Sequence, residues 1–358
     1  MRQPRIALEA TAVCRARRTG IAQYALNLMA ELGTGSPDLR YEHYYRLSRA
    51  WKKGSGRAPA HGVRRRWFQD PVWPIFKDLD LIHGLDAKVP NWRGVKSIAT
   101  VHDLWLWIEA QESGAPEPSM AAGTRRLATT CDAIVAVSEA TRQDFLARVD
   151  YPEDRVHVCH HGVDPRFRPR IPEQQSAWCA ERGLDRPFVL YVGDEVGRKN
   201  LPRLFDAWRE SPARADFDFV IAGPVRAETL AGVPAVKRLG YVSDEDLEWL
   251  YASCAAFLYP TLYEGFGLPI IEAMASGAGV LTSNTGASPE VAGGHAVTVD
   301  ALQVDAIRDG IDRVLALSSE QLVAAREHTA RFTWARCARE TAAVHKLTLD
   351  RDPLHTAS

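Results

Sequence analysis

Short apolar runs recur along this chain, and most are followed by a loop and then by a helical pattern. Apolar runs of about four to eight residues are typical of strands that helices cover on both faces. The alternation therefore predicts an α/β fold with parallel sheets. The expected strands span residues 5–10, 80–83, 95–101, 131–137 and 155–159 in the first half, and 187–193, 217–222, 240–242, 255–259 and 279–283 in the second.

A proline-rich stretch, PRFRPRIP at residues 165–172, separates the two series of strands. Proline lacks a backbone donor and fixes φ, so this stretch predicts a linker. With 358 residues, the chain is long enough for two domains of ordinary size. We therefore expect one domain at residues 1–168 and a second at residues 169–336.

Composition narrows the protein class. The hydrophobic content of 46% and the charged content of 25% are those of a globular protein rather than a disordered chain. No run approaches the ~18 apolar residues of a membrane span, and the N-terminus has no signal-peptide core. Six scattered cysteines without a C-x-x-C pair indicate a reduced compartment. We expect a cytoplasmic protein.

The net charge of −1 combines two unlike halves. Residues 1–170 carry 26 Lys and Arg against 19 Asp and Glu, a net charge of +7, and residues 171–358 carry −8. One interpretation is that the first half faces an anionic partner. The other is a chance difference in composition between two domains.

Cations and aromatic residues are mixed between residues 41 and 78, most densely at 49–76. Such a segment could lie on an anionic membrane surface, with its rings at the level of the headgroups. It could also bind nucleic acid, although the overall charge of −1 weighs against that. The third interpretation is a loop and helix whose rings pack inward and whose arginines are solvated.

The stretch LYEGFGLPIIEAM, residues 262–274, places two glutamates around a glycine-rich turn. Pro269 suits the first turn of a helix, and we expect Glu264 in the loop and Glu272 in that first turn. The free N–H groups of a helix N-terminus bind anions, and carboxylates accept hydrogen bonds from hydroxyls. An anion joined to a polyol is what a sugar nucleotide presents.

Two further loops follow predicted strands. Arg198 and Lys199 stand between the strand at 187–193 and a helix from residue 201, where two fixed cations are placed to hold a diphosphate. Gly20 precedes a helical pattern and would let a phosphate or sugar approach the backbone. The alternatives are solvated cations and a loop glycine without a chemical role.

Histidines mark the ends of two predicted strands. His102 and Asp103 follow the strand at 95–101, at the edge where α/β folds bind ligands, and a histidine there can donate to a substrate hydroxyl or stabilise a developing charge. A satisfied histidine at the core edge is the alternative. His160 and His161 have no further metal ligands at suitable spacing, so we expect no metal site.

With these residues identified, the chain resembles the family 4 retaining glycosyltransferases of the group 1 type over nearly its whole length. The most specific match is YEGFGLPIIEAMASG, which resembles the family's E-x₇-E motif with Glu264 and Glu272 as its glutamates. GRKN resembles the phosphate-binding loop, with Arg198 and Lys199 as its cations. Further matches are TGIAQY at Gly20, TVHDL at His102, AVSEATRQD, HGVDPRFRP, PEV and FTWARCARE.

This resemblance implies the GT-B fold, in which two facing Rossmann-like domains hold the active site between them and a C-terminal helix, here about 337–358, crosses back to the first domain. It implies retaining transfer from a nucleotide-diphosphate sugar without metal or other cofactor. Glu264 would hold sugar hydroxyls, Glu272 the ribose hydroxyls, and His102 would face the transferred sugar. The donor site would also include Gly20, Val242, Gly265, Phe266, Gly267 and Leu268.

The RKN sequence resembles the bacterial hexosyl- and mannosyltransferase branch, which favours GDP-mannose as donor. We expect a lipid-linked or polysaccharide acceptor in cell-surface glycan synthesis, with the enzyme in the cytoplasm or peripheral on the inner membrane face. Two segments depart from the family's pattern: Ala-Gly-Val follows Gly277, and the loop before Arg198 is acidic and long. The second departure concerns donor fit. The alternatives are a non-catalytic protein that binds nucleotide sugars and a sugar-phosphate synthase of the same fold.

Overall fold

The structure is a computed structural model that describes residues 2–14, 19–35, 37–49, 65–68, 78–90, 92 and 94–354. The chain divides into two compact units. Unit 1 contains residues 1–162 and 333–358, and unit 2 contains residues 163–332. The bounds expected from the sequence were 1–168 with 337–358, and 169–336.

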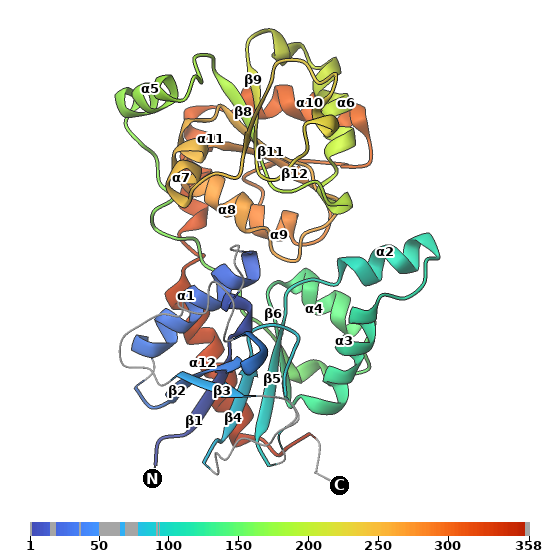
Figure 1. Ribbon diagram of the computed structural model, residues 1–358, viewed down its shortest axis with the longest axis vertical. Coiled ribbons are helices and arrows are strands. Elements are labelled where there is room, and N and C mark those ends of the chain that lie inside the picture. Colours follow the sequence, from blue (N-terminus) through green and yellow to red (C-terminus); the bar gives the residue numbers. More distant parts are fainter. Residues whose placement is uncertain are drawn as a thin grey trace. The chain divides into compact units, whose positions relative to one another are not determined.

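The described residues of unit 1 form a seven-stranded sheet in the order β3-β2-β1-β4-β5-β6-β7, with every neighbouring pair parallel (Figure 1). Its strands are β1 Arg5–Glu9, β2 Arg40–Arg46, β3 Arg65–Phe68, β4 Leu81–Gly84, β5 Lys96–Val101, β6 Ala133–Ala136 and β7 Val156–Val158. Its α-helices are α1 Gly20–Gly35, α2 Trp105–Ser113, α3 Ser119–Thr130, α4 Glu139–Leu146 and α12 Trp334–Asp350.

Unit 2 has a six-stranded parallel sheet in the order β10-β9-β8-β11-β12-β13. Its strands are β8 Phe188–Val192, β9 Asp218–Ala222, β10 Val236–Gly240, β11 Ala256–Tyr259, β12 Gly279–Ser283 and β13 Val297–Val299. Its α-helices are α5 Pro172–Glu181, α6 Leu201–Glu210, α7 Asp244–Ser253, α8 Leu268–Ala275, α9 Ser288–Ala292, α10 Val304–Leu315 and α11 Ser319–Thr329. Figure 1 shows helices on both sides of the strands within this unit.

Both sheets reverse their strand order once, between β1 and β4 in unit 1 and between β8 and β11 in unit 2. Loops leave such a point in opposite directions and open a crevice at the carboxyl ends of the strands, where α/β proteins bind ligands. The predicted α/β fold with parallel sheets is therefore confirmed, and each unit has one preferred place for a site. The last helix, α12, belongs to unit 1 and packs against α1 and β6.

The predicted elements differ from the structure in several places, and strands β2 and β13 were not predicted. Residues 40–46 form the buried strand β2, which was missed because its sequence, RYEHYYR, is not an apolar run. The strand expected at 240–242 lies earlier, as β10. The stretch 165–172 is packed into unit 2 rather than linking two domains: Phe167 is buried and Arg170 pairs with Glu248 at 2.8 Å.

The segment with mixed cations and aromatic residues is described only in part. Residues 65–68 form strand β3, beside β2, whereas one of the three interpretations of the sequence was a loop and helix. Residues 50–64 and 69–77 lie outside the described residues, and so does most of the predicted membrane-facing segment at 49–76. Among the described residues, no helix combines the length and apolar character needed to cross a bilayer.

Candidate active site

The strand reversal of unit 2 brings together Arg198, Lys199 and Glu264. Arg198 and Lys199 lie in a short 3-10 turn after β8, Gly197–Lys199, and Glu264 lies in the loop after β11. Oε1 of Glu264 is 2.8 Å from Nη1 of Arg198 and 2.8 Å from Nζ of Lys199. The Lys199 ammonium also donates to the Tyr259 hydroxyl. The two predicted phosphate ligands thus share one carboxylate oxygen, which the sequence did not reveal.

This cluster is buried and charged. Glu264 and Lys199 are 6% and 8% exposed. Burial alone would raise the pKa of Glu264, but the charges of Lys199 and Arg198 outweigh it and lower that pKa. Burial lowers the pKa of Lys199, and the Glu264 carboxylate opposes that shift. Breaking a buried pair of this kind leaves an uncompensated charge, so the three side chains hold one another in place.

The glycine-rich loop leads from Glu264 into α8. Gly267 has a φ of 99°, a conformation that favours glycine, and it directly precedes the first residue of α8, Leu268. Phe266 is buried and packs edge-on against Phe332, with ring centroids 5.8 Å apart. Gly265 and Gly267 are both buried. The loop therefore directs the first N–H groups of α8 toward the crevice edge of the sheet, where they can bind an anion.

Glu272 lies in the second turn of α8, not in its first turn as expected, because the helix begins at Leu268. It is partly buried, and burial raises its pKa to about 7 against the opposing influence of Arg166 and Tyr251. Arg166 comes from the proline-rich stretch and is 3.7 Å from Glu248 of α7. Val242, in the loop between β10 and α7, is half-buried. Glu272 thus occupies its own polar environment, separate from the Arg198–Lys199–Glu264 cluster.

In unit 1, His102 directly follows β5, as predicted. Its Nε2 lies 3.0 Å from the Leu85 carbonyl oxygen, which can only accept, so Nε2 carries the proton. Burial lowers the pKa of His102 and favours the neutral ring. In that form Nδ1 is an acceptor. The donation to a substrate hydroxyl that the sequence suggested is therefore not available from the neutral ring, whose one N–H is already used.

Gly20 is the first residue of α1 and is exposed, with open space where a Cβ would lie. The adjacent Thr19 side chain accepts a hydrogen bond from the Ala22 amide at 3.3 Å and so caps the helix. Residues 15–18 of the preceding loop lie outside the described residues. The structure therefore places Gly20 at a helix N-terminus without a steric need for glycine there.

His161, one of the adjacent histidines for which we expected no metal site, packs among aromatic rings of unit 1. His161 is buried and packs against the rings of Tyr24 and Trp334, with centroids 4.7 Å and 5.8 Å away. No group of three or more His, Cys, Asp or Glu side chains suited to a metal ion occurs in the described ranges.

Sequence reasoning missed several polar residues at these edges. Tyr24 packs edge-on against His102 at 4.8 Å, and Tyr259 bonds Lys199. Glu9 ends β1, is buried, and has its pKa raised to about 7 by burial. Its place at the carboxyl end of the first strand was the one available signal.

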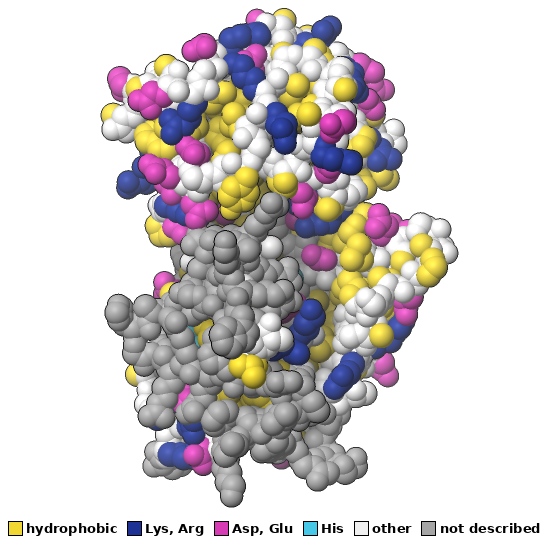
Figure 2. All heavy atoms as spheres, viewed as in Figure 1, with side chains coloured by type: hydrophobic (Ala, Val, Ile, Leu, Met, Phe, Trp, Pro, Cys, Tyr) yellow, Lys and Arg dark blue, Asp and Glu magenta, His cyan; other side chains and the backbone are white. Residues whose placement is uncertain are grey.

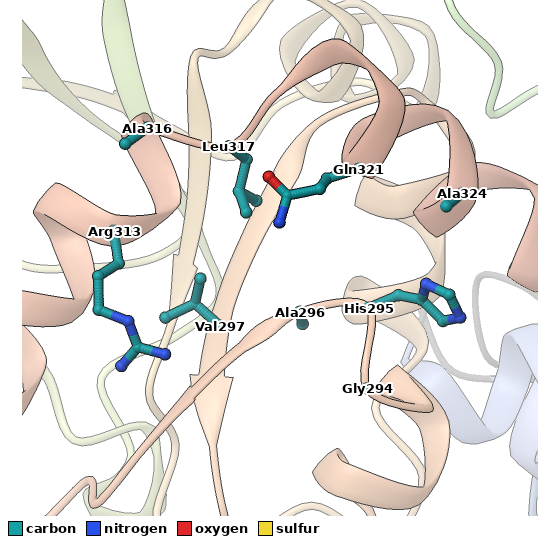
Figure 3. A pocket seen from close by; sticks show the side chains of 9 residues that line it. All are labelled: Gly294, His295, Ala296, Val297, Arg313, Ala316, Leu317, Gln321 and Ala324. Atoms are coloured by element: carbon teal, nitrogen blue, oxygen red, sulfur yellow. The ribbon is translucent and has the colours of Figure 1, made fainter.

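A surface hollow of about 450 Å³ lies elsewhere in unit 2, beside β13, α10 and α11 (Figure 3). None of the predicted site residues lines it. Its polar side chains, Arg313, His295 and Gln321, are all exposed, unlike the buried Glu264 cluster. On the visible face of unit 2, Lys and Arg are interspersed with Asp and Glu rather than gathered by sign (Figure 2). We therefore assign no site to this hollow.

Comparison with known proteins agrees with the geometry. A family model described as "Glycosyl transferases group 1" matches residues 177–331, and "Glycosyltransferase Family 4" matches residues 20–167. The chain is 28% identical to O-antigen chain mannosyltransferase B of Escherichia coli, over 92% of this chain and 96% of that protein. It is 27% identical to alpha-maltose-1-phosphate synthase of Mycolicibacterium smegmatis, over 71% of this chain and 73% of that one.

Solved structures share the fold. A glycosyltransferase from Rickettsia africae superposes with a TM-score of 0.72 at 16% identity, covering 98% of this chain and all of that one. Anabaena HepE in complex with UDP and glucose superposes with a TM-score of 0.73 at 15% identity, covering 96% of this chain and all of that one. The fold is therefore GT-B, as predicted. Matched by both family models, the chain belongs to the family 4, group 1 glycosyltransferases.

Proposed function

We propose that this glycosyltransferase moves a hexose, with mannose favoured, from a nucleotide-diphosphate sugar to a lipid-linked or polysaccharide acceptor, with retention of anomeric configuration. The observation that carries the proposal is the buried Arg198–Lys199–Glu264 cluster at the strand reversal of unit 2. The similarity to an O-antigen mannosyltransferase supports the choice of sugar and of acceptor class.

The cluster suits a donor that is both anionic and rich in hydroxyls. Arg198 can bind a diphosphate through its planar fork and Lys199 as a point charge. Each gains new acceptors when the diphosphate enters, which leaves Glu264 to accept hydrogen bonds from sugar hydroxyls. The N-terminus of α8, together with Gly265, Phe266, Gly267 and Leu268, adds backbone donors and a partial positive charge. We propose that these groups stabilise the leaving diphosphate without a metal ion or another cofactor.

The remaining roles follow from position. Glu272 is proposed to bind the ribose hydroxyls, with Val242 and Gly20 also in the donor site. His102 is proposed to face the transferred sugar, where its acceptor Nδ1 or its backbone carbonyl stabilises positive charge at the anomeric carbon. The proposed reaction uses front-face attack: the acceptor oxygen bonds the anomeric carbon on the side from which the diphosphate leaves, and the acceptor proton passes to that diphosphate.

A donor panel tests this function. GDP-mannose, UDP-glucose, UDP-N-acetylglucosamine and dTDP-rhamnose would be compared by thermal shift and by hydrolysis of the purified protein. We expect GDP-mannose to raise the melting temperature most and to be hydrolysed fastest. Glu272→Ala should raise the donor KM, while an exposed control in the same unit, Glu181→Ala, should not. If no sugar nucleotide binds, or if Glu272→Ala leaves KM and kcat unchanged, the assignment fails.

A second candidate is a sugar-phosphate synthase, which the similarity to alpha-maltose-1-phosphate synthase favours. It would use the same donor site but would take a sugar phosphate as acceptor. Mannose 1-phosphate or glucose 1-phosphate, supplied with the preferred donor, separates the two functions. Rapid formation of a phosphorylated disaccharide would show that the acceptor is a sugar phosphate and would contradict the proposed glycan acceptor.

Cytoplasmic action at an anionic membrane surface through residues 49–76 stays a proposal, because most of that segment lies outside the described residues. Flotation with liposomes with and without anionic lipid tests it. Salt-sensitive binding to anionic liposomes alone is expected. If the same amount of protein floats with both kinds of liposome, this segment does not bind an anionic membrane surface.

A further inference from the structure

A continuous series of hydrogen bonds crosses the interior of unit 1 and ends beside His102. Oη of Tyr41 is 3.2 Å from Nδ1 of His345, and Nε2 of His345 is 2.9 Å from Nδ1 of His83. Nε2 of His83 is 2.9 Å from Oγ1 of Thr100, which is 3.1 Å from Oη of Tyr24. All five side chains are buried, four of them completely. We call these five residues the Tyr41–Tyr24 chain.

The two histidines in this chain are neutral. Burial lowers the pKa of His345 to about 3, and burial together with the neighbouring His345 lowers the pKa of His83 well below its usual range. A neutral imidazole has one donor and one acceptor nitrogen. The bond between the two rings therefore fixes one proton on one ring, and the other hydrogen bond of each histidine must then run in the same direction.

Burial favours one of the two directions. If the chain ran from Tyr41 toward Tyr24, His83 would donate to Thr100, and the hydroxyl proton of either Thr100 or Tyr24 would have no acceptor within the chain, at a site with no exposure. In the opposite direction, Tyr24 donates to Thr100, Thr100 to His83, His83 to His345, and His345 to Tyr41. The chain then ends at the Tyr41 hydroxyl, which accepts from His345 and lies nearer the surface at 8% exposure. Tyr24 is accordingly the donor at the inner end.

The inner end of the chain lies against the candidate active site. The Tyr24 ring meets His102 edge-on, with centroids 4.8 Å apart and planes at 79°. The Tyr24 ring also packs against the rings of His161 and Trp334, with centroids 4.7 Å and 6.3 Å away. Among the described residues, the His102 side chain forms one hydrogen bond, to the Leu85 carbonyl oxygen. The orientation of its ring therefore depends on that bond and on the rings of Tyr24 and His161, the latter with its centroid at 5.6 Å.

We propose that His345, on the C-terminal helix, is a positioning residue for glycosyl transfer: through His83 and Thr100 it holds Tyr24, which holds the ring of His102. The kinetic part of this proposal rests on the proposed function, whereas the structural coupling does not. The Tyr41–Tyr24 chain of hydrogen bonds joins α12, near the end of the sequence, to β4, β5 and α1 in its first third. Its effect is to make the last helix part of the support for His102.

Matched variants test the coupling. His345→Leu removes both hydrogen bonds of the ring, while His345→Gln keeps one acceptor and one donor. Thr100→Val removes the hydroxyl that joins His83 to Tyr24, while Thr100→Ser keeps it. Tyr24→Phe keeps the ring against His102 and loses only its bond to Thr100. Thr129→Val, on the exposed surface of α3, serves as a control for replacing a threonine.

The first readout is the imidazole ¹⁵N spectrum of the full chain labelled at histidine, with the His102 signals assigned from a His102→Asn variant. We expect His345→Leu, Thr100→Val and Tyr24→Phe to shift or broaden the His102 signals. His345→Gln and Thr100→Ser should return them to wild-type positions. Unchanged His102 signals in Thr100→Val and Tyr24→Phe overturn the proposal, even if His345→Leu does not fold.

The second readout is donor turnover. The three disruptive variants should lower kcat roughly 2- to 10-fold, the range expected for one neutral hydrogen bond, and should leave the donor KM unchanged. A rise in KM at constant kcat would contradict a role in positioning. If the wild-type protein turns over no sugar nucleotide, the proposed function fails while the ¹⁵N spectra still decide the coupling.

Discussion

The two units share a sheet plan but place different chemistry at the carboxyl ends of their strands. Unit 2 gathers ionised groups, with Glu264 held between Arg198 and Lys199. Unit 1 gathers neutral ones, with His102 beside Tyr24 and a chain of buried histidines behind it. The difference suits a reaction in which one unit binds a diphosphate and the other faces a sugar with transient positive charge. It also means that the two units should respond differently to substitution and to pH.

The largest effect is expected where the charged cluster of unit 2 is broken. Glu264→Ala leaves Lys199 buried without its carboxylate and should lower the free energy of unfolding by about 3–5 kcal/mol. Urea denaturation measures this. Asp206→Ala, which removes an exposed partner of Arg209 in the same unit, should cost less than about 1 kcal/mol. Equal costs would show that burial does not distinguish the cluster.

The next effect concerns binding of the donor. Lys199→Ala removes the proposed charge-assisted contact with the diphosphate, which should cost about 1.5–3 kcal/mol of transition-state stabilisation. We therefore expect kcat/KM for the sugar nucleotide to fall roughly 10- to 150-fold. Steady-state kinetics with the preferred donor check it. Lys237→Ala, on the edge strand β10, is the control and should have little effect. A change smaller than twofold for Lys199→Ala would remove Lys199 from the proposed site.

The pH response sharpens the comparison, because each unit holds one carboxyl group with a pKa raised to about 7: Glu9 in unit 1 and Glu272 in unit 2. A raised folded-state pKa favours the protonated form, so stability should fall as pH rises from about 4.5 to about 7 and then level off. Glu272→Gln should remove about 1–2 kcal/mol of this fall, after allowance for partial exposure.

Urea midpoints between pH 5 and 7.5 provide the measurement. Glu9→Gln should remove a separate part of the slope, since the residue lies in the other unit. Glu181→Gln, at an exposed position, should leave the slope as it is. A slope that survives both substitutions at Glu9 and Glu272 would mean that neither carboxyl group is protonated in the folded protein at pH 6.

The smallest expected effect is that of metal removal. If Arg198, Lys199 and the N-terminus of α8 neutralise the leaving diphosphate, EDTA should leave donor turnover unchanged. Turnover before and after chelation measures this. Loss of activity that Mg²⁺ or Mn²⁺ restores would overturn the proposal of metal-free transfer and would require ligands other than those proposed.

The parts of the site that could be predicted from sequence are local. Arg198, Lys199, Glu264 and His102 each follow an apolar strand within a few residues, and a parallel sheet brings the ends of its strands to one edge. That rule gives the edge on which a residue lies but not which side chains touch. The shared oxygen of Glu264 joins residues 65 and 66 positions apart, and no local pattern encodes such a pair.

The parts that failed have other physical causes. Strand β2 was missed because its buried positions include the ionisable Glu42 and His43, and Glu42 is compensated by Arg5 at 3.0 Å. The proline-rich stretch lacks regular structure, yet its arginines pair with Glu248 and hold it to unit 2. The Tyr41–Tyr24 chain joins residues up to 304 positions apart and was beyond any spacing rule.

The polypeptide passes from unit 1 to unit 2 and back, and this path determines the order in which synthesis completes the two units. The chain leaves unit 1 after Gly162 and returns at Thr333, where the Trp334 amide nitrogen would lie 2.2 Å from any Cβ added to Gly162. Unit 2 is thus one uninterrupted segment, whereas unit 1 needs both ends of the chain. On the ribosome, unit 2 is complete before unit 1 has received α12, which carries His345. Premature termination after Phe332 would therefore spare the proposed donor-binding residues Arg198, Lys199 and Glu264 and remove the proposed support of His102.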